Sequence, residues 1–267
     1  MLQRIRLACF GDVVGKSGRA ALRRRLNDIR CELNLNFVLV NGENSAGGLG
    51  IDIDSTKEIF NAGADVITLG DHAFNRREVL TVFDRERRVI RPFNYPPETP
   101  GFGWFRYVLS PTINIGVFTV LGTVFMEDGK VSCPFRAAKD LLSGPLEGCE
   151  IILAEIHAEA TSEKSAFGWH LDGLVTLVFG THTHVPTADE KILPKGTGFI
   201  TDIGMCGPSE SVIGMDIETA LHRFISPLPR SHKVGRGDAT INGLVIEYDV
   251  IERKIVSLSR IAESVKI

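Results

Sequence analysis

Two histidines are separated by a single residue in the segment Thr181-His182-Thr183-His184. In an extended segment, side chains at positions i and i+2 point to the same side, so both imidazoles can face one site. Gly180 and Pro186 favour a loop around the pair. The pair alone is a weak indication, because a polar surface loop with two exposed histidines would have the same sequence. It indicates a metal site only if further ligands accompany it.

Further ligands of suitable chemistry occur elsewhere in the chain. They are carboxylates, one amide and one imidazole: Asp12, Glu43, Asn44, Asp71 and His157. With His182 and His184 they form a set without thiolates, which suits iron, manganese, cobalt or zinc. Two such ions held about 3.5–4 Å apart form a clamp for phosphoryl displacement. We therefore predict a two-metal site that acts on phosphoesters.

The elements that must position these residues are short apolar segments that alternate with helical patterns. Strands are predicted over 5–10, 37–40, 66–69, 113–120, 151–156, 174–179 and 244–250, and helices over 18–33, 55–62, 76–88 and 211–224. This alternation favours an α/β fold with helices packed on a sheet. The candidate ligands, and His72 beside Asp71, follow or end five of the strands. Because ligand sites of open α/β sheets form beyond the carboxyl ends of strands, we expect them to meet at one sheet edge.

The composition is that of an ordinary globular protein. Hydrophobic residues make up 43% and charged residues 24% of the 267 residues, and no repeat or linker is visible, so we predict one domain over 1–267. The net charge of -3 argues against a general nucleic-acid or anionic-membrane surface. No apolar run approaches the ~20 residues of a membrane helix. Five scattered cysteines without a CxxC pair argue against a disulfide framework and favour the cytoplasm.

Two other hydrolase classes are disfavoured by motif spacing. The segment from Gly11 to Ser17 is similar to a Walker A loop, but three residues separate its glycines where that loop has four. The phosphate-binding geometry depends on this length, so we reject a nucleoside triphosphatase. A GxSxG elbow does not occur in the sequence, so a serine hydrolase lacks its nucleophile motif.

Longer motifs show a family resemblance. FGDVVGKSGR (10–19), NGEN (41–44), HAEATSEK (157–164), GTHTHVPTAD (180–189) and TDIGMCGP (201–208) closely resemble the YmdB-like branch of the calcineurin-like metallophosphoesterases. The resemblance covers nearly the whole chain. It implies a four-layer α/β/β/α sandwich with two mixed sheets between helices. It also implies a dinuclear centre, often of iron or manganese, and phosphodiesterase activity towards small substrates such as 2',3'-cyclic nucleotides.

The resemblance also implies a role for each candidate ligand. Asp12 and His184 would hold one ion, and Asp71, His157 and His182 would hold the other. Three further candidates would serve both ions or the substrate: Glu43, Asn44 and His72.

Glu43 would bridge the two ions, and Asn44 would coordinate nearby. His72 would be the acid that meets the phosphate or the leaving group. The usual pattern of the family is Gly-Asn-His, whereas this chain has Gly70-Asp71-His72, so a carboxylate replaces an amide ligand. The replacement is compatible with metal binding and bears on the choice of metal and on turnover.

We therefore predict a metal-dependent phosphodiesterase whose partner is a small phosphodiester, without a stable nucleic-acid partner. The alternative is a metal-binding regulatory protein whose hydrolysis is incidental. Its partners would contact the predicted loop 91–103, where aromatic side chains either stack on a base or pack the loop itself: Phe93, Tyr95, Phe102 and the adjacent Trp104. A homo-oligomer is compatible with both hypotheses.

Overall fold

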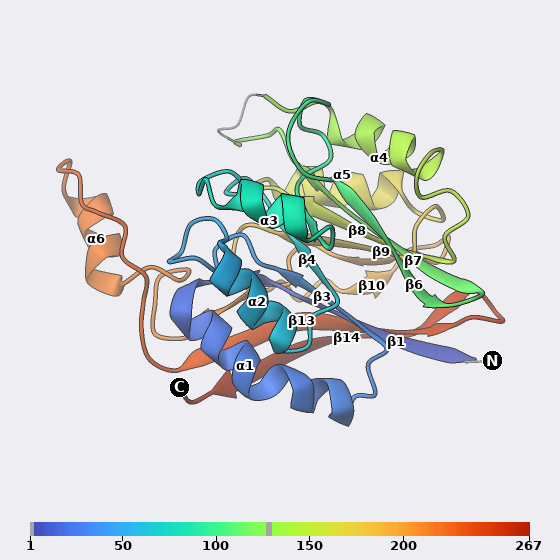
Figure 1. Cartoon of the computed structure of the whole chain (residues 1–267), viewed down its shortest axis with the longest axis horizontal. Coiled ribbons are helices and arrows are strands. Elements are labelled where there is room, and N and C mark those ends of the chain that lie inside the picture. The colour runs from blue at the N-terminus through green and yellow to red at the C-terminus, as the bar shows by residue number, and fades with distance from the viewer. Residues whose placement is uncertain (1–2, 127–129) are drawn as a thin grey trace.

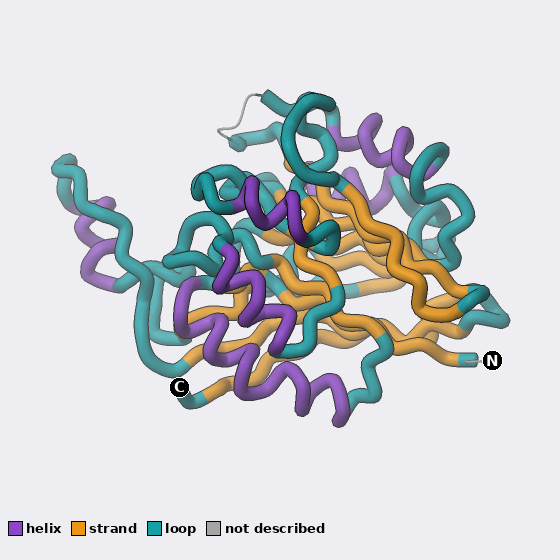
Figure 2. The backbone as a smooth tube through the Cα atoms, in the orientation of Figure 1, coloured by secondary structure: helices purple, strands orange, loops and turns teal. Residues whose placement is uncertain are grey.

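Two β-sheets lie face to face at the centre of the protein, with helices on both outer faces (Figure 1). The structure is a computed structural model and describes residues 3–126 and 130–267. Figure 2 shows the strands gathered in the middle and the helices at the outside. The predicted four-layer α/β/β/α sandwich is confirmed.

The first sheet carries the N-terminal strands and the last two strands of the chain. Its members are β1 (Arg4–Phe10), β2 (Asp12–Val13), β3 (Phe37–Asn41), β4 (Val66–Thr68), β5 (Val89–Ile90), β12 (Met205–Pro208), β13 (Ala239–Asp249) and β14 (Lys254–Val265). They are arranged as β2-β12-β13-β1-β3-β4-β5, and β14 also pairs with β13. Strands β1, β3, β4 and β5 are parallel, whereas β13 is antiparallel to β1.

The second sheet is built from the middle of the chain. Its members are β6 (Trp104–Ser110), β7 (Ile113–Leu121), β8 (Ile151–His157), β9 (Leu177–Thr181), β10 (Lys191–Ile192) and β11 (Gly198–Ile200). They are arranged as β10-β11-β9-β8-β7-β6, in which β7, β8, β9 and β11 are parallel. The fully buried strand β8, with the sequence IILAEIH, lies between β7 and β9.

Three hydrophobic clusters separate the four layers. The first sheet is covered by α1 (Gly15–Glu32), α2 (Ile53–Asn61) and α3 (Val79–Arg85), and the second by α4 (Pro134–Leu142) and α5 (Thr161–His170). Leu22 and Leu26 of α1 pack against the first sheet, and Phe167 of α5 packs against the second. Between the sheets, side chains such as Leu7 and Leu153 form a third, buried cluster. Alternate residues of β1 therefore face different cores, as the period of a strand requires.

Several predicted boundaries were wrong. Helices α4 and α5 were not predicted, and helix α3 is shorter than the predicted 76–88. Strand β9 begins at Leu177 instead of 174, because Leu174 is 45% exposed in a turn. The predicted loop 91–103 is confirmed as irregular backbone. Phe93 of this loop and the adjacent Trp104 pack against the core between the second sheet and its helices, and Tyr95 packs edge to face on Phe74. Phe102 is 38% exposed and lies under the guanidinium of Arg87.

The segment between β12 and β13, residues 209–238, extends away from the body, and we call it the arm (Figure 1). It holds α6 (Ile217–Ile225), which begins later than the predicted 211–224. Ile213 and Gly214 have positive φ angles of 46° and 95°, so the chain turns there before the helix begins. The Asp216 side chain then caps α6 by accepting a bond from the Thr219 amide at 3.1 Å.

The described residues contain no helix that is long and apolar enough to cross a membrane.

Candidate metal centre

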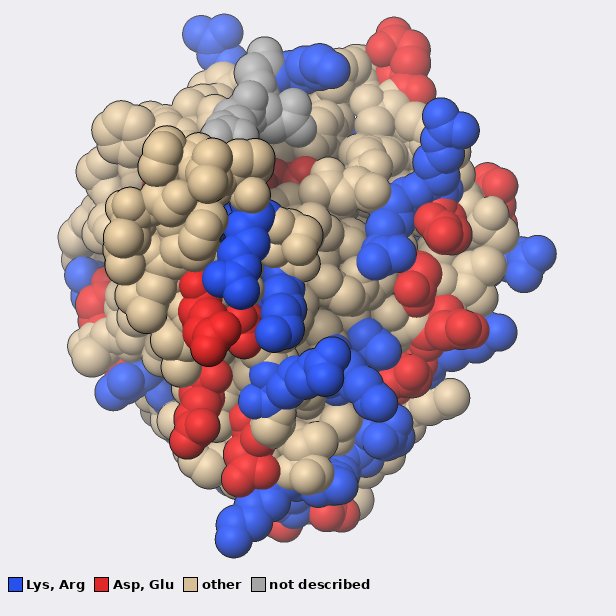
Figure 3. Space-filling view, turned by 90° about the vertical axis from the view of Figure 1, so that its left-hand side faces the viewer, with Lys and Arg blue, Asp and Glu red and all other residues tan. Residues whose placement is uncertain are grey.

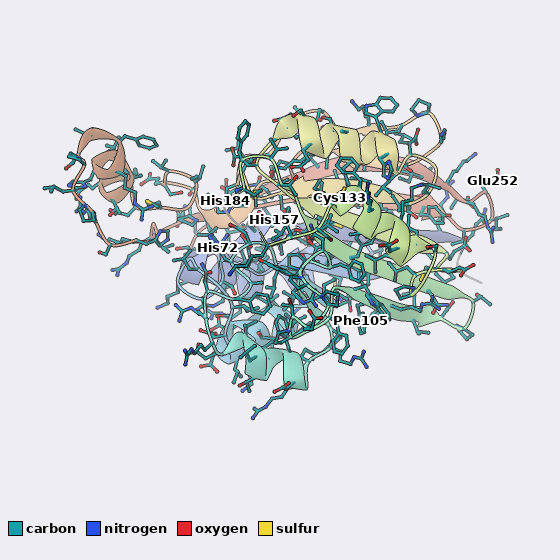
Figure 4. All side chains as sticks on the ribbon, turned by 90° about the horizontal axis from the view of Figure 1, so that it is seen from above. His72, Phe105, Cys133, His157, His184 and Glu252 are labelled. Atoms are coloured by element: carbon teal, nitrogen blue, oxygen red, sulfur yellow. The ribbon has the colours of Figure 1, made fainter. Side chains whose placement is uncertain are left out.

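The carboxyl ends of strands from both sheets meet at one place, and the candidate ligands gather there. Asp12 lies in β2, Glu43 follows β3, Asp71 follows β4, His157 ends β8 and His182 follows β9. Figure 4 shows His72, His157 and His184 close to one another on the side of the body from which the arm extends. The candidate ligands therefore converge as expected, but they come from the carboxyl ends of two sheets and not from the edge of one.

Four of these side chains offer ligand atoms that all lie within 4.8 Å of one another: Glu43, Asp71, His157 and His182. His157 Nε2 is 2.8 Å from Asp71 Oδ1, 3.2 Å from Glu43 Oε1 and 3.1 Å from His182 Nδ1. Two imidazole nitrogens and two carboxylate oxygens thus face a common point. This donor set suits a divalent transition metal.

The orientation of His157 is fixed from behind. Its Nδ1 lies 2.9 Å from Thr181 Oγ1, and the Thr181 hydroxyl donates to Glu155 Oε1 at 2.6 Å. All three residues are fully buried. Since the hydroxyl proton goes to Glu155, Thr181 accepts from His157, and the proton of the neutral imidazole lies on Nδ1. Nε2 is then free to bind a metal, as in many metal sites with a hydrogen-bonded histidine.

His182 and His184 are held in strained backbone conformations, with φ angles of 93° and 66°. His182 Nε2 is 3.4 Å from Glu159 Oε2, which leaves Nδ1 directed at Asp71 and His157. His184 Nδ1 lies 2.8 Å from the carbonyl oxygen of Ile213, so its Nε2 is the unprotonated atom. Both imidazoles therefore direct a nitrogen lone pair to the site. Their loop holds this arrangement with strained backbone angles.

Asn44 connects His72 to the cluster. The Asn44 amide donates to Glu43 Oε1 at 3.0 Å and lies 3.2 Å from His184 Nε2, and its Oδ1 is 2.7 Å from His72 Nδ1. In this arrangement His72 donates through Nδ1, and its Nε2 lies 3.6 Å from Asp71 Oδ2. Asn44 faces His184 with its nitrogen, so coordination by this residue requires its oxygen to turn towards the metal.

A buried oxygen of Asp12 provides the test of whether metal ions fit the site. Asp12 Oδ2 accepts from the His182 amide at 3.3 Å, whereas Oδ1 is buried without a hydrogen-bond partner in the described part of the chain. An unpaired buried carboxylate oxygen is costly unless a cation compensates it. Together with the donor set around His157, this oxygen fits a metal ion.

In the metal-free cluster, the negative charges of Glu43 and Asp71 are compensated by a proton on His157. Burial opposes ionisation of Glu43 and Asp71, but charge and hydrogen bonding from His157 outweigh it and lower the pKa of both carboxyls. The same carboxylates raise the pKa of His157 well above 6.5 despite its burial. Burial raises the pKa of Asp12, and His184 and His157 oppose this only in part. A proton on His157 thus supplies positive charge where a metal ion would.

Close approach at the site requires glycine at Gly70. A Cβ atom there would lie 2.3 Å from Glu43 Oε2 and 2.3 Å from His157 Nε2, inside the ligand cluster. Any side chain at this position would displace a ligand. Glycine at position 70 is therefore required by the packing of the centre, and it is also the first residue of the Gly-Asp-His sequence.

A second buried network holds the His-x-His loop, and the sequence did not reveal it. Lys164 Nζ donates to Asp202 Oδ2 at 2.7 Å, and both side chains are 1% exposed. The same Asp202 oxygen accepts from the Thr183 hydroxyl at 2.7 Å. Glu155, Glu159 and Thr181 were also missed. All lie within or next to recognised motifs, but their roles depend on contacts between separate strands.

A cavity of about 380 Å³ opens in front of the centre. Its inner wall contains Glu43, Asn44, His72, His182 and His184, so the cluster is accessible to a ligand. Larger cavities lie over α3, along the loop 91–103, and between the start of α1 and residues 232–237, and none of the candidate ligands is among the described residues that line them. A volume of this size is in the range of small-molecule sites.

Known proteins share both the sequence and the fold. The chain matches the family described as YmdB-like protein over residues 8–261. A 2',3'-cyclic-nucleotide 2'-phosphodiesterase of Bacillus subtilis is 38% identical over 257 residues, which cover 96% of each chain. A putative phosphatase/phosphodiesterase of Mycoplasma pneumoniae is 34% identical over 266 residues, covering 98% of this chain and 94% of that protein.

Solved structures agree with these sequence matches. A hypothetical protein from Thermus thermophilus superposes with a TM-score of 0.92 at 38% identity, covering 98% of this chain and all of its own. A novel phosphatase from Mycoplasma pneumoniae superposes with a TM-score of 0.93 at 33% identity, covering all of this chain and 95% of its own. The family match extends from β1 to β14 and includes every candidate ligand, and the chain belongs to the YmdB-like family.

Proposed function

We propose that the protein is a dinuclear-metal phosphodiesterase that hydrolyses small phosphodiesters, with 2',3'-cyclic nucleotides as its substrate class. The observation that carries the proposal is the cluster of His157, His182, Asp71 and Glu43, of which Glu43 and His182 line an open cavity. The activity named for the Bacillus subtilis relative supports the choice of substrate.

Two sets of residues would hold the metal ions. Asp71, His157 and His182 form the compact set, in which Asp71 Oδ1 is 3.4 Å from His182 Nδ1. Asp12 and His184 would hold the second ion. When bound, two such ions activate water and neutralise phosphoryl oxygens. Iron or manganese is our first choice, with zinc or cobalt as alternatives.

Glu43 would be the ligand shared by both sets. Its Oε1 is 3.2 Å from His157 Nε2, and its Oε2 accepts from the His72 amide at 3.2 Å. Asn44, directly beside it, contacts His184. A carboxylate between two cations reduces their repulsion, which supports Glu43 as the bridging ligand and Asn44 as a nearby one.

His72 is the candidate general acid. It lines the cavity, its side chain is 30% exposed, and Asn44 Oδ1 fixes its ring through Nδ1. With Nδ1–H donated to Asn44, Nε2 carries a proton only in the imidazolium form, and in that form it can donate this proton to the departing alkoxide of a substrate. Proton transfer from His72 would assist cleavage of a poor leaving group more than that of a good one.

Metal analysis combined with turnover tests the proposal. We expect about two transition-metal ions per chain and hydrolysis of 2',3'-cyclic nucleotides in preference to long single-stranded RNA. Absence of bound metal, with no activity restored by manganese or iron, would exclude the two-metal enzyme. Stoichiometric metal with negligible turnover on a panel of cyclic and linear phosphodiesters would instead support the regulatory alternative.

A further inference from the structure

The arm forms one wall of the cavity in front of the metal centre. The cavity is lined by five residues of the arm together with the histidines of the centre: Ile213, Gly214, Met215, Arg223 and His232. The base of the arm contacts the body through the Ile213 carbonyl, which lies 2.8 Å from His184 Nδ1. Within the arm, the Gly235 amide donates to the Gly214 carbonyl at 2.9 Å and joins its two ends. Residues far from the ligand motifs thus complete the pocket.

Arg223 differs from the other cavity residues in its charge. It is the only Lys or Arg among the described residues that line the cavity. Its guanidinium forms no ion pair or side-chain hydrogen bond with the described part of the chain. The neighbouring arm cation Arg230 differs, because it contacts Glu218 at 3.9 Å and lies outside the cavity lining.

His232 links Arg223 to the centre. Burial, followed by the charges of Arg223 and then of His72, lowers the pKa of His232. His232 therefore lies within electrostatic range of both side chains. Leu49 and Met215, both partly buried, complete an apolar surface beside it. The cavity thus combines a cation, Arg223, with an apolar surface and with His72, the candidate general acid. This combination suits a nucleotide, which has both an anionic phosphate and an apolar base.

A charge count shows why the cavity needs this cation. Asp12, Glu43 and Asp71 at the centre and Glu159 in the lining together carry four negative charges when ionised. The proposed pair of divalent ions carries four positive charges, so these groups cancel. Arg223 then makes the pocket positive as a whole, and its planar fork matches the oxygens of a phosphate.

We propose that Arg223 is a substrate-binding residue of the enzyme, which holds the phosphodiester by its non-bridging oxygens from the arm side of the cavity. The assignment rests on the proposed function and names a specificity residue for it. Figure 3 views the molecule from the side of the arm and shows Lys and Arg side chains gathered over the middle and lower part of this face.

The test compares Arg223→Gln with Arg223→Lys and with the matched control Arg230→Gln, which also removes one charge from the arm. Adenosine 2',3'-cyclic phosphate is the substrate, because its only phosphate is the reacting one. Calorimetric binding of adenosine 3'-monophosphate to the manganese-loaded proteins gives a readout that is independent of turnover. Arg223 is exposed, so we expect all variants to fold.

We expect Arg223→Gln to raise KM and the Kd of the mononucleotide about tenfold, as loss of one charge-assisted hydrogen bond would, with kcat changed less than about twofold. Arg223→Lys should recover part of the affinity, and Arg230→Gln should match the wild type. Added salt should weaken binding to the wild type more than to Arg223→Gln.

Unchanged binding in Arg223→Gln, or an equal loss in Arg230→Gln, would overturn the assignment. If the wild-type enzyme fails to hydrolyse the cyclic nucleotide but Arg223→Gln still weakens mononucleotide binding, the proposed reaction is wrong and the binding role of Arg223 stands.

Discussion

The metal centre and the arm face each other across one cavity, but they are held in place by different means. His157 is fully buried and has partners at both ring nitrogens. Helix α6 in the arm buries only Thr219 and Ala220, while Phe224 is 85% exposed. The centre is therefore fixed by many contacts between strands, whereas the arm depends on its base and on a helix cap.

This difference indicates a division of roles. Substitutions at the centre should act on metal binding and kcat, because ligand geometry there is set by buried contacts. Substitution of an arm side chain such as Arg223 should act mainly on KM, because it lines the cavity and forms no hydrogen bond or ion pair with a candidate ligand in the described part of the chain. Variants of the two regions can separate effects on metal binding and kcat from effects on KM, or show that they are not separable.

The largest effect is expected for Glu43→Gln. The glutamine amide has nearly the same shape as the carboxylate, but it is neutral. The Glu43 side chain is 1% exposed and its Oε1 lies 3.2 Å from His157 Nε2, so the substitution removes a buried charge. We expect kcat to fall by more than about a thousandfold, in line with loss of an electrostatic group that acts on the transition state. Turnover, metal content and thermal melting should be measured together. A folded variant with near-normal kcat would show that Glu43 is peripheral.

A smaller loss is expected for Thr181→Val, which removes the hydroxyl between His157 and Glu155 without changing the shape of the side chain. Loss of such an orienting partner lowers metal affinity or activity by roughly 10–100-fold. The matched control is Thr119→Val, a buried threonine in β7 of the same sheet, whose hydroxyl has a single hydrogen bond within the described residues, to the Leu69 carbonyl at 3.5 Å. Metal titration measures the metal affinity of both variants. An equal loss of affinity in the two would contradict a specific role for Thr181.

The pH dependence of the metal-free protein should differ from that of the metal-bound protein. The raised pKa of His157 means that its proton stabilises the fold fully below pH 6.5, and that this contribution is lost as the pH rises through the folded-state value. Burial also raises the pKa of Glu155, to about 7, so its ionisation destabilises the fold in the same direction. The lowered pKa of Asp71 gives stability that is present above pH 3.8 and is lost on further acidification.

We therefore expect the metal-free protein to melt at a higher temperature near pH 6 than near pH 8. Added metal displaces the His157 proton, so its apparent affinity should rise roughly tenfold per pH unit over this interval. Melting curves with and without manganese measure both effects. A metal affinity that is independent of pH would show that His157 binds no metal or carries no proton in the free protein.

The sequence predicted the centre better than the arm, for physical reasons. The ligands follow contiguous apolar strands, and parallel strands bring their carboxyl ends to one edge, so the convergence of His157 and Glu43 could be expected. Buried partners such as Asp202 depend on contacts between distant segments, which no local pattern encodes. Arg223 and His232 lie in a segment without clear periodicity, where the predicted helix 211–224 was placed too early. Their position at the cavity depends on the turn at Ile213 and Gly214.

A smaller effect concerns Asp71, where the family resemblance of the sequence led us to expect asparagine. Asp71 Oδ1 contacts both His157 and His182, so Asp71→Asn should weaken metal retention, because an amide is a poorer ligand than a carboxylate. The same change adds one positive charge to the cavity, and we expect a several-fold higher turnover once metal is saturating. A variant that is slower at every pH under saturating metal would contradict this electrostatic account.

The double variant Asp71→Asn with Arg223→Gln sharpens the comparison of the two regions. It restores the charge of the wild-type cavity while leaving the arm without its cation. If Arg223 acts only through net charge, the KM of the double variant should return to that of the wild type, and the two effects should cancel on a logarithmic scale. If Arg223 acts through direct hydrogen bonds to phosphate, KM should stay raised although the charge is restored, because a long-range charge does not replace a bidentate contact. We expect the second result. Full recovery would mean that the arm contributes an electrostatic field and not a binding contact.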